Sequence, residues 1–111
     1  MQISFEELRR IIKSVDIPVY RDEAPVTAKY PYIVYEFVSE IHKRASNRVI
    51  CSMPLYQISL ITNGIEKDYL PLKRVLDQNK VSYSEFETYP FDENDNTITQ
   101  YITYVRCIHN G

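Results

Sequence analysis

The 111-residue sequence contains only two glycines and two cysteines. Two glycines are too few for a glycine-rich loop that would hold a phosphate group. Cys51 and Cys107 lie far apart, and two thiols are too few for a disulfide scaffold. We therefore expect both thiols to be reduced, in a protein without a glycine-rich phosphate-binding loop.

The sequence also lacks long uninterrupted apolar runs, low-complexity stretches and internal repeats. The N-terminal segment MQISFEELRR has acids where a secretory signal would need a basic and then an apolar stretch. A chain of 111 residues with 44% hydrophobic content can bury one core but hardly two. We expect a single cytosolic domain over residues 1–111, without membrane contact.

Few residues suggest catalysis or metal binding. A nucleophile and its base would have to come from the two cysteines and from His42 or His109, and nothing local orients either histidine. The same four residues lack the short ligand spacing of a structural zinc site. Glu85 and Glu87 share one face of an expected strand, where exposed acids are common. We predict no catalytic residue, no metal ligand and no cofactor, so the protein is not expected to be an enzyme.

The first half of the chain reads as a helix followed by strands. Ser4 and Glu7 have the spacing of a capping box, and apolar residues then recur at helical intervals, which predicts a helix over residues 4–15. Alternating apolar and polar residues then predict a brief strand and two longer ones. These three strands cover residues 17–20, 30–38 and 53–62.

A second helix is expected after the turn signal Asn63–Gly64. Apolar residues at spacings of four, three and four predict a helical stripe that ends near Asn79. An interior proline would break this helix. We therefore place Asp68 at the N-cap and Pro71 in the first turn.

The last third of the chain predicts a closing hairpin. Its strands are residues 81–89 and 97–108, which are rich in Tyr, Thr, Val and Ile, and its turn is residues 90–96. The order is then helix, strands, helix, strands. It predicts an α+β fold with a mainly antiparallel sheet and two helices packed on one face.

Charge is unevenly distributed although the net charge is only −2. Residues 41–50 hold three cations and no acid, residues 85–95 hold five acids and no base, and the rest of the chain is neutral. Both segments can be ordinary solvated loops. Alternatively, complementary patches on identical subunits can meet head to tail and form a ring. The candidate contacts are His42, Lys43, Arg44, Asn47 and Arg48 in a flexible arm at residues 40–52, and the acids Glu85, Glu87, Asp92, Glu93 and Asp95.

The ten tyrosines are numerous for a chain of this size. Tyrosine is a good strand former and also a common anchor in protein interfaces. One sheet face cannot easily hide so many rings, so some are expected to contact another subunit. The candidates are Tyr30, Tyr32, Tyr56 and Tyr101.

The whole chain resembles the tail terminator and tail completion proteins of long-tailed phages and prophages. The similarity lies in the order of a FEELRRIIKS helix, a YPYIVYEF strand, a long connection, a PLYQISLIT strand, a YLPLKRVLDQ helix and a hairpin from FETY to TITQYITYV. This resemblance implies a structural protein that forms a hexameric ring on the head-proximal end of the tail tube, ends tube polymerisation and joins tail to head.

The resemblance also implies partners and a location. The partners are further copies of the chain, the major tail tube protein, and a head–neck connector or stopper protein, and the ring would form either in solution or only on the tail. DNA would pass through the ring, where the arm would contact a neighbouring subunit, the end of the tube or this DNA. The protein would be found in the bacterial host cytoplasm during assembly and then in the virion tail.

Two other functions fit the sequence. The chain can be another neck component, such as a head completion or stopper protein. It can also be a small nucleic-acid-binding module, with the basic arm on phosphates and exposed tyrosines on bases. Three cations are a small footprint for that role, and the net charge of −2 opposes general DNA binding.

Overall fold

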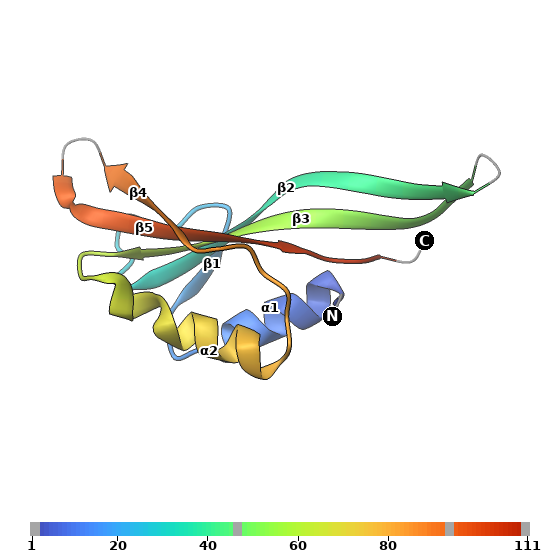
Figure 1. Ribbon diagram of the computed structural model, residues 1–111. Helices are drawn as coiled ribbons and strands as arrows, with labels where there is room; N and C mark the ends of the chain where they lie inside the picture. The colour runs from blue at the N-terminus through green and yellow to red at the C-terminus, as the bar shows by residue number, and fades with distance from the viewer. Residues whose placement is uncertain (1–2, 46–47, 93–94, 110–111) are drawn as a thin grey trace.

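The computed structural model describes residues 3–45, 48–92 and 95–109. It is an α+β fold with two α-helices and a five-stranded, mostly antiparallel sheet of order β1-β2-β3-β5-β4 (Figure 1). This confirms the predicted fold class and order of elements. The elements are α1 (Phe5–Lys13), β1 (Val19–Arg21), β2 (Tyr32–Ala45), β3 (Arg48–Thr62), the 3₁₀ helix η1 (Glu66–Tyr69), α2 (Leu70–Gln78), β4 (Glu87–Asp92) and β5 (Asp95–Arg106).

The core lies between the two helices and one face of the sheet. Both helices lie on the same side of the sheet in Figure 1. From the central strand β3, Ile58 and Leu60 are fully buried, and α2 places Leu72 and Leu76 in the same cluster. Burying such side chains stabilises the fold by about 1.5–3 kcal/mol each. The opposite sheet face is not covered by a helix.

Helix α1 follows its sequence signals closely. The Glu7 N–H donates to the Ser4 side-chain oxygen at 3.2 Å, as a capping box requires. Leu8, Ile11 and Ile12 are buried against the sheet. The regular helix ends at Lys13 rather than at residue 15.

Helix α2 starts differently from the prediction. Pro71 does lie in the first turn, but the residue before the helix is Tyr69, which makes no side-chain capping bond. The prediction that Asp68 is the N-cap was wrong. Its carboxylate instead accepts a hydrogen bond of 2.5 Å from the Thr62 hydroxyl at the end of β3, across the turn.

The closing hairpin is shifted along the chain relative to the prediction. Residues 81–86 are not a strand, and β4 instead includes Pro90, which was expected in the turn. An edge strand tolerates proline because one row of its N–H groups needs no partner. The coil before β4 is held to β5 at Ser84, whose N–H donates to the Tyr104 carbonyl at 3.0 Å and whose Oγ accepts from the Tyr104 N–H at 2.8 Å. One backbone bond and a side-chain bond therefore stand where a continuous strand pairing was predicted.

Strands β2 and β3 are longer than predicted. We expected β2 to end at residue 38 and β3 to begin at residue 53, with a connection between them. Instead, the two strands stay paired as far as Ala45 of β2 and Arg48 of β3. A register shift between Phe37 and Ser39 marks where the ribbon leaves the sheet, as β-bulges commonly do. Below, "the arm" denotes the described residues 40–45 and 48–52. It projects from one end of the molecule in Figure 1; its expected flexibility stays a prediction.

No helix within residues 3–45, 48–92 and 95–109 is long and apolar enough to span a membrane.

Candidate functional site

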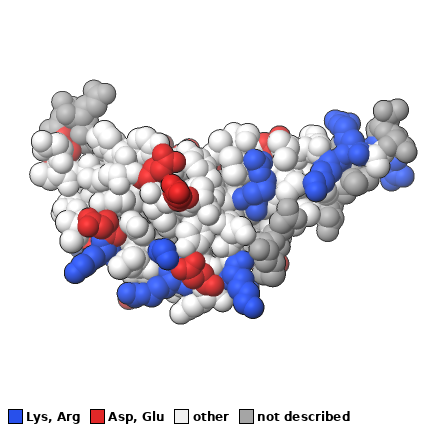
Figure 2. All heavy atoms as spheres, in the orientation of Figure 1, with Lys and Arg blue, Asp and Glu red and all other residues white. Residues whose placement is uncertain are grey.

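The arm gathers three cations at its outer end. The register pairs Ala45 with Arg48 and Lys43 with Cys51, so Lys43, Arg44 and Arg48 lie within the last few residue pairs of the ribbon. All three side chains are exposed, and none forms an ion pair with a described residue. Figure 2 shows blue side chains along the projecting end of the molecule. The end of the arm is therefore a cationic surface that has no ion-pair partner within the described part of the chain.

His42 has a partner within the arm. Its Nε2 lies 3.0 Å from Glu40 Oε2. Hydrogen bonds from His42 and then from Ser52 lower the pKa of the Glu40 carboxyl. His42 is therefore a less available contact than the three cations. The predicted contact Asn47 lies outside the described residues.

Apolar side chains are exposed where the arm leaves the sheet. Phe37 is 50% exposed, and Ile41 is 51% exposed. β1 pairs with β2 only as far as Tyr35, so β2 is an outer strand from there to the end of the arm. An outer strand with apolar side chains readily pairs with another chain.

The acids predicted to form a surface lie in the coil before β4 and in the β4–β5 hairpin, where the register pairs Asp92 with Asp95. Glu85 precedes β4 and does not share a strand face with Glu87, so that expectation was wrong. Glu87 accepts a hydrogen bond from the Tyr89 hydroxyl at 2.9 Å. Asp95 accepts from the Thr97 hydroxyl at 2.6 Å, which lowers the pKa of Asp95. The side chain of Asp92 and all of Glu93 lie outside the described part of the chain.

Two of the tyrosine candidates belong to the core. Tyr56 is 8% exposed and stacks on Phe5 with ring centroids 4.4 Å apart. Tyr101 is 7% exposed and contacts the ring of Tyr69. Neither ring is available to a neighbouring subunit, so the structure removes both as interface anchors. Tyr32 is also mostly buried, but on the other sheet face, where it stacks with the exposed Tyr30.

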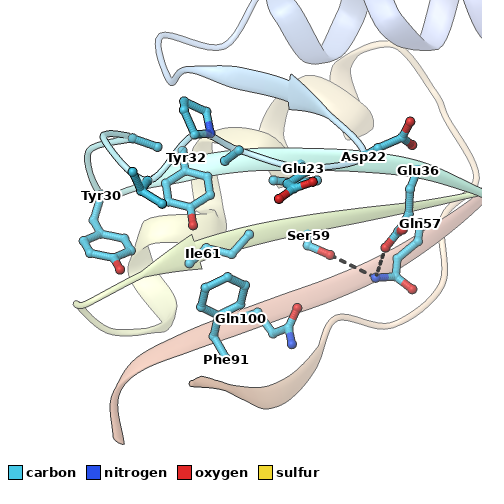
Figure 3. Close-up of a pocket in the computed structure, with 15 residues that line it drawn as sticks. Asp22, Glu23, Tyr30, Tyr32, Glu36, Gln57, Ser59, Ile61, Phe91 and Gln100 are labelled. Atoms are coloured by element: carbon cyan, nitrogen blue, oxygen red, sulfur yellow. Dashed lines mark hydrogen bonds between the residues drawn. The ribbon is translucent and has the colours of Figure 1, made fainter. Parts of the chain in front are cut away.

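The structure adds a site that we did not predict. A hollow of about 460 Å³ lies on the sheet face opposite the helices, between strands β2, β3 and β5 and the segment 22–30 (Figure 3). Below, "the groove" denotes this hollow. Its lining includes three acids, Asp22, Glu23 and Glu36, together with Tyr30, Tyr32 and Gln57. No Lys, Arg or His is among the described residues that line it.

Local sequence explains how the groove forms. Asp22 has a left-handed backbone with φ 64°, which aspartate tolerates better than most residues. This turn ends β1, and the Asp22 N–H donates to the Tyr35 carbonyl at 2.9 Å. Glu36 lies on the polar side of β2 and accepts from Gln57 Nε2 at 3.2 Å. The polar alternation of β2 and the acids of the RDEAP turn were visible in the sequence, but not their proximity.

The thiols and histidines give no sign of a reactive centre. Burial, and secondly the nearby charge of Glu6, raise the pKa of the Cys107 thiol to about 11, which disfavours a thiolate. Cys51 is also free and buried. Within the described residues no group of three His, Cys, Asp or Glu side chains is placed to hold a metal ion. That the protein is not an enzyme stays a prediction.

The sequence matches no protein-family model and no curated protein. The resemblance to tail terminator proteins therefore stays a prediction that rests on the order and sequence of the segments.

Proposed function

We propose that this protein is a tail terminator subunit. It assembles into a ring on the head-proximal end of a long phage tail tube, ends polymerisation of the tube and joins the tail to the head. The observation that carries the proposal is the projecting arm, whose cations and apolar side chains have few partners within the subunit.

The shape of the arm supports contact with another molecule. The β3–β5 pairing stops at Leu55 and Arg106, so most of the arm is a ribbon of two strands. Among the described residues, the bridge between Ser52 and His109 places a third chain segment beside the base of the ribbon. An isolated two-stranded ribbon is marginally stable in water. A ribbon of this kind gains stability when a neighbour covers it.

The position of the arm supports head-to-tail assembly. The arm lies at one end of the molecule, and the C-terminal end of β4 and the start of β5 lie at the other (Figure 1). A contact between one end of a subunit and a different surface of the next is heterologous, and such contacts close into rings when the rotation permits. Six subunits in the ring is the number that the resemblance implies. A terminator would do no chemistry, so the lack of a reactive centre among the described residues agrees with this role.

Assembly on tail tubes tests the proposal. The purified chain is mixed with tubes of the major tail protein, and binding is measured by sedimentation and by negative-stain imaging of the tube ends. We expect one ring at one end of each tube, and tubes that no longer elongate. A chain that stays monomeric and does not bind tubes would contradict the proposal.

A charge-reversal variant tests whether the arm carries the contact. Lys43→Glu with Arg44→Glu and Arg48→Glu should abolish ring formation. The control is Arg9→Glu with Lys67→Glu and Arg74→Glu, which changes the net charge equally at exposed positions on the helices. The control should still form rings. Equal loss in both variants would show that net charge, rather than the arm, governs assembly.

The cationic ribbon also keeps DNA binding as a second candidate, because a two-stranded β-ribbon fits the major groove of DNA. A mobility shift that weakens with salt and is lost in the arm variant only, without any binding to tail tubes, would favour it.

A further inference from the structure

We infer that the groove receives the end of the arm of a second copy of this chain. The inference rests on the proposed function and identifies the surface through which neighbouring subunits would join. Lys43, Arg44 and Arg48 of one subunit would enter between segment 22–30 and the sheet of the next.

Charge complementarity identifies the occupant. The groove has the carboxylates of Asp22, Glu23 and Glu36 in its lining, and no cation among its described residues. Figure 3 shows Asp22 and Glu36 at one end of it. The nearest cation to Asp22 is Arg21, with Nε 4.0 Å from the carboxylate and both side chains largely exposed. Such an exposed contact leaves the Asp22 carboxylate available for a second cation.

Aromatic rings provide a second reason for a cationic occupant. Tyr30 and Tyr32 lie at the other end of the groove in Figure 3, stacked with ring centroids 5.6 Å apart. An arginine guanidinium binds well over such a ring. Arg21 already makes contacts of this kind, because its guanidinium lies 5.2 Å from the centre of the Phe5 ring and 5.9 Å from that of the Tyr35 ring. Arg44 and Arg48 have the same chemistry.

Size and direction agree with a neighbour's side chains. A hollow of about 460 Å³ suits a few side chains and not a whole hairpin. The subunit's own arm continues the strands that form the floor of the groove, and it points away from that floor (Figure 1). A second copy must therefore supply the occupant.

The groove is a better acceptor than the acids of residues 85–95. Glu87 and Asp95 already accept hydrogen bonds from Tyr89 and Thr97. Glu36 likewise accepts from a neutral donor, Gln57. The difference is that Glu36, Asp22 and Glu23 line one hollow, and none of the described acids of residues 85–95 lines it.

Complementary variants test the pairing in the full-length chain, with tail tubes added if the wild type assembles only on them. The groove variant is Asp22→Asn with Glu23→Gln and Glu36→Gln. The arm variant is Lys43→Gln with Arg44→Gln and Arg48→Gln. Each alone should associate about tenfold more weakly than the wild type or worse. An equimolar mixture should form one-to-one pairs, because each variant keeps the surface that the other has lost.

The matched control is Glu85→Gln with Glu87→Gln and Asp95→Asn, which removes the same charge from the surface predicted from the sequence. It should associate as the wild type does. Normal assembly of the groove variant, with loss of assembly in this control, would overturn the inference and leave the proposed function standing. If the wild type associates neither alone nor on tail tubes, the proposed function fails, and the inference fails with it.

A crosslinking experiment keeps the inference falsifiable if the groove variant does not fold. Photoreactive p-benzoylphenylalanine in place of Ala45 leaves all three cations intact. Illumination of the assembled protein should give intermolecular crosslinks to segment 22–30 or to Tyr32, mapped by mass spectrometry. Crosslinks confined to residues 85–95, or to the tube protein, would overturn the assignment of the groove while supporting assembly itself.

Discussion

The body of this protein and its arm are held together in different ways. In the body, two helices cover one face of the sheet, and Ile58 and Leu60 of β3 and Leu72 and Leu76 of α2 are fully buried. In the arm, described residues 40–45 are all exposed, and the backbone pairing of two strands is the main support. The sequence of the body is explained by folding, whereas that of the arm is not. The arm is therefore the region for which we propose contacts with other molecules.

The largest expected contrast concerns apolar side chains. Leu72→Ala should lower the free energy of unfolding by about 2–5 kcal/mol, because it leaves a cavity between α2 and the sheet. Ile41→Ala in the arm should change it by less than about 0.5 kcal/mol, because that side chain is half exposed. Urea denaturation followed by circular dichroism measures both values. A large loss in Ile41→Ala would show that the arm belongs to the cooperative core.

The contrast also explains which parts of the fold the sequence predicts. Helix α1 and the core of β2 and β3 follow local rules, because a capping residue and alternating burial leave their pattern in the sequence. The arm does not, because residues 40–45 are all exposed and need no alternation, although Cys51 near the base of the arm is buried. Its cations therefore resemble those of a solvated loop. For this reason we placed the end of β2 too early in the chain and the start of β3 too late.

The candidate site shows the same limit. The cationic end of the arm is local in sequence, so Lys43, Arg44 and Arg48 were found. The groove joins Asp22 and Glu23 to Glu36 and Gln57, which come from separate segments and meet only through strand pairing and a left-handed turn at Asp22. The acids at 85–95 are close together in the sequence, which made them conspicuous, but Glu85 lies in the coil before β4 and does not share a strand face with Glu87.

A smaller contrast is expected for hydrogen bonds. The Thr62 hydroxyl donates to Asp68 and accepts from the Gly64 N–H at 2.9 Å, so it closes the turn after β3. Thr62→Val leaves both partners unsatisfied and should cost about 1–3 kcal/mol of unfolding free energy. In the arm, His42→Ala removes the exposed contact to Glu40 and should cost less than about 0.5 kcal/mol. Equal losses in chemical denaturation would contradict the separation of body from arm.

The smallest contrast concerns pH. Hydrogen bonds from the Tyr83 hydroxyl and then from Lys73 lower the pKa of Asp77 on α2, and His42 and Ser52 lower that of Glu40. A carboxyl with a lowered pKa stabilises the fold above its unfolded pKa of about 4 and loses that contribution as pH falls through the folded pKa. Asp77→Asn should therefore make the thermal unfolding midpoint fall less steeply below about pH 4.

The matched change in the arm is Glu40→Gln. It should not alter how steeply the thermal unfolding midpoint falls below about pH 4, although the pKa of Glu40 is lowered like that of Asp77. The reason is that a two-stranded ribbon opens locally at lower free energy than the whole fold, so the Glu40 contact is already lost when the body unfolds. Thermal melts of both variants at a series of pH values measure the difference. If the unfolding midpoint falls less steeply with pH in both variants, arm and body unfold together. The arm would then be part of the cooperative folding unit and not a ribbon that opens separately.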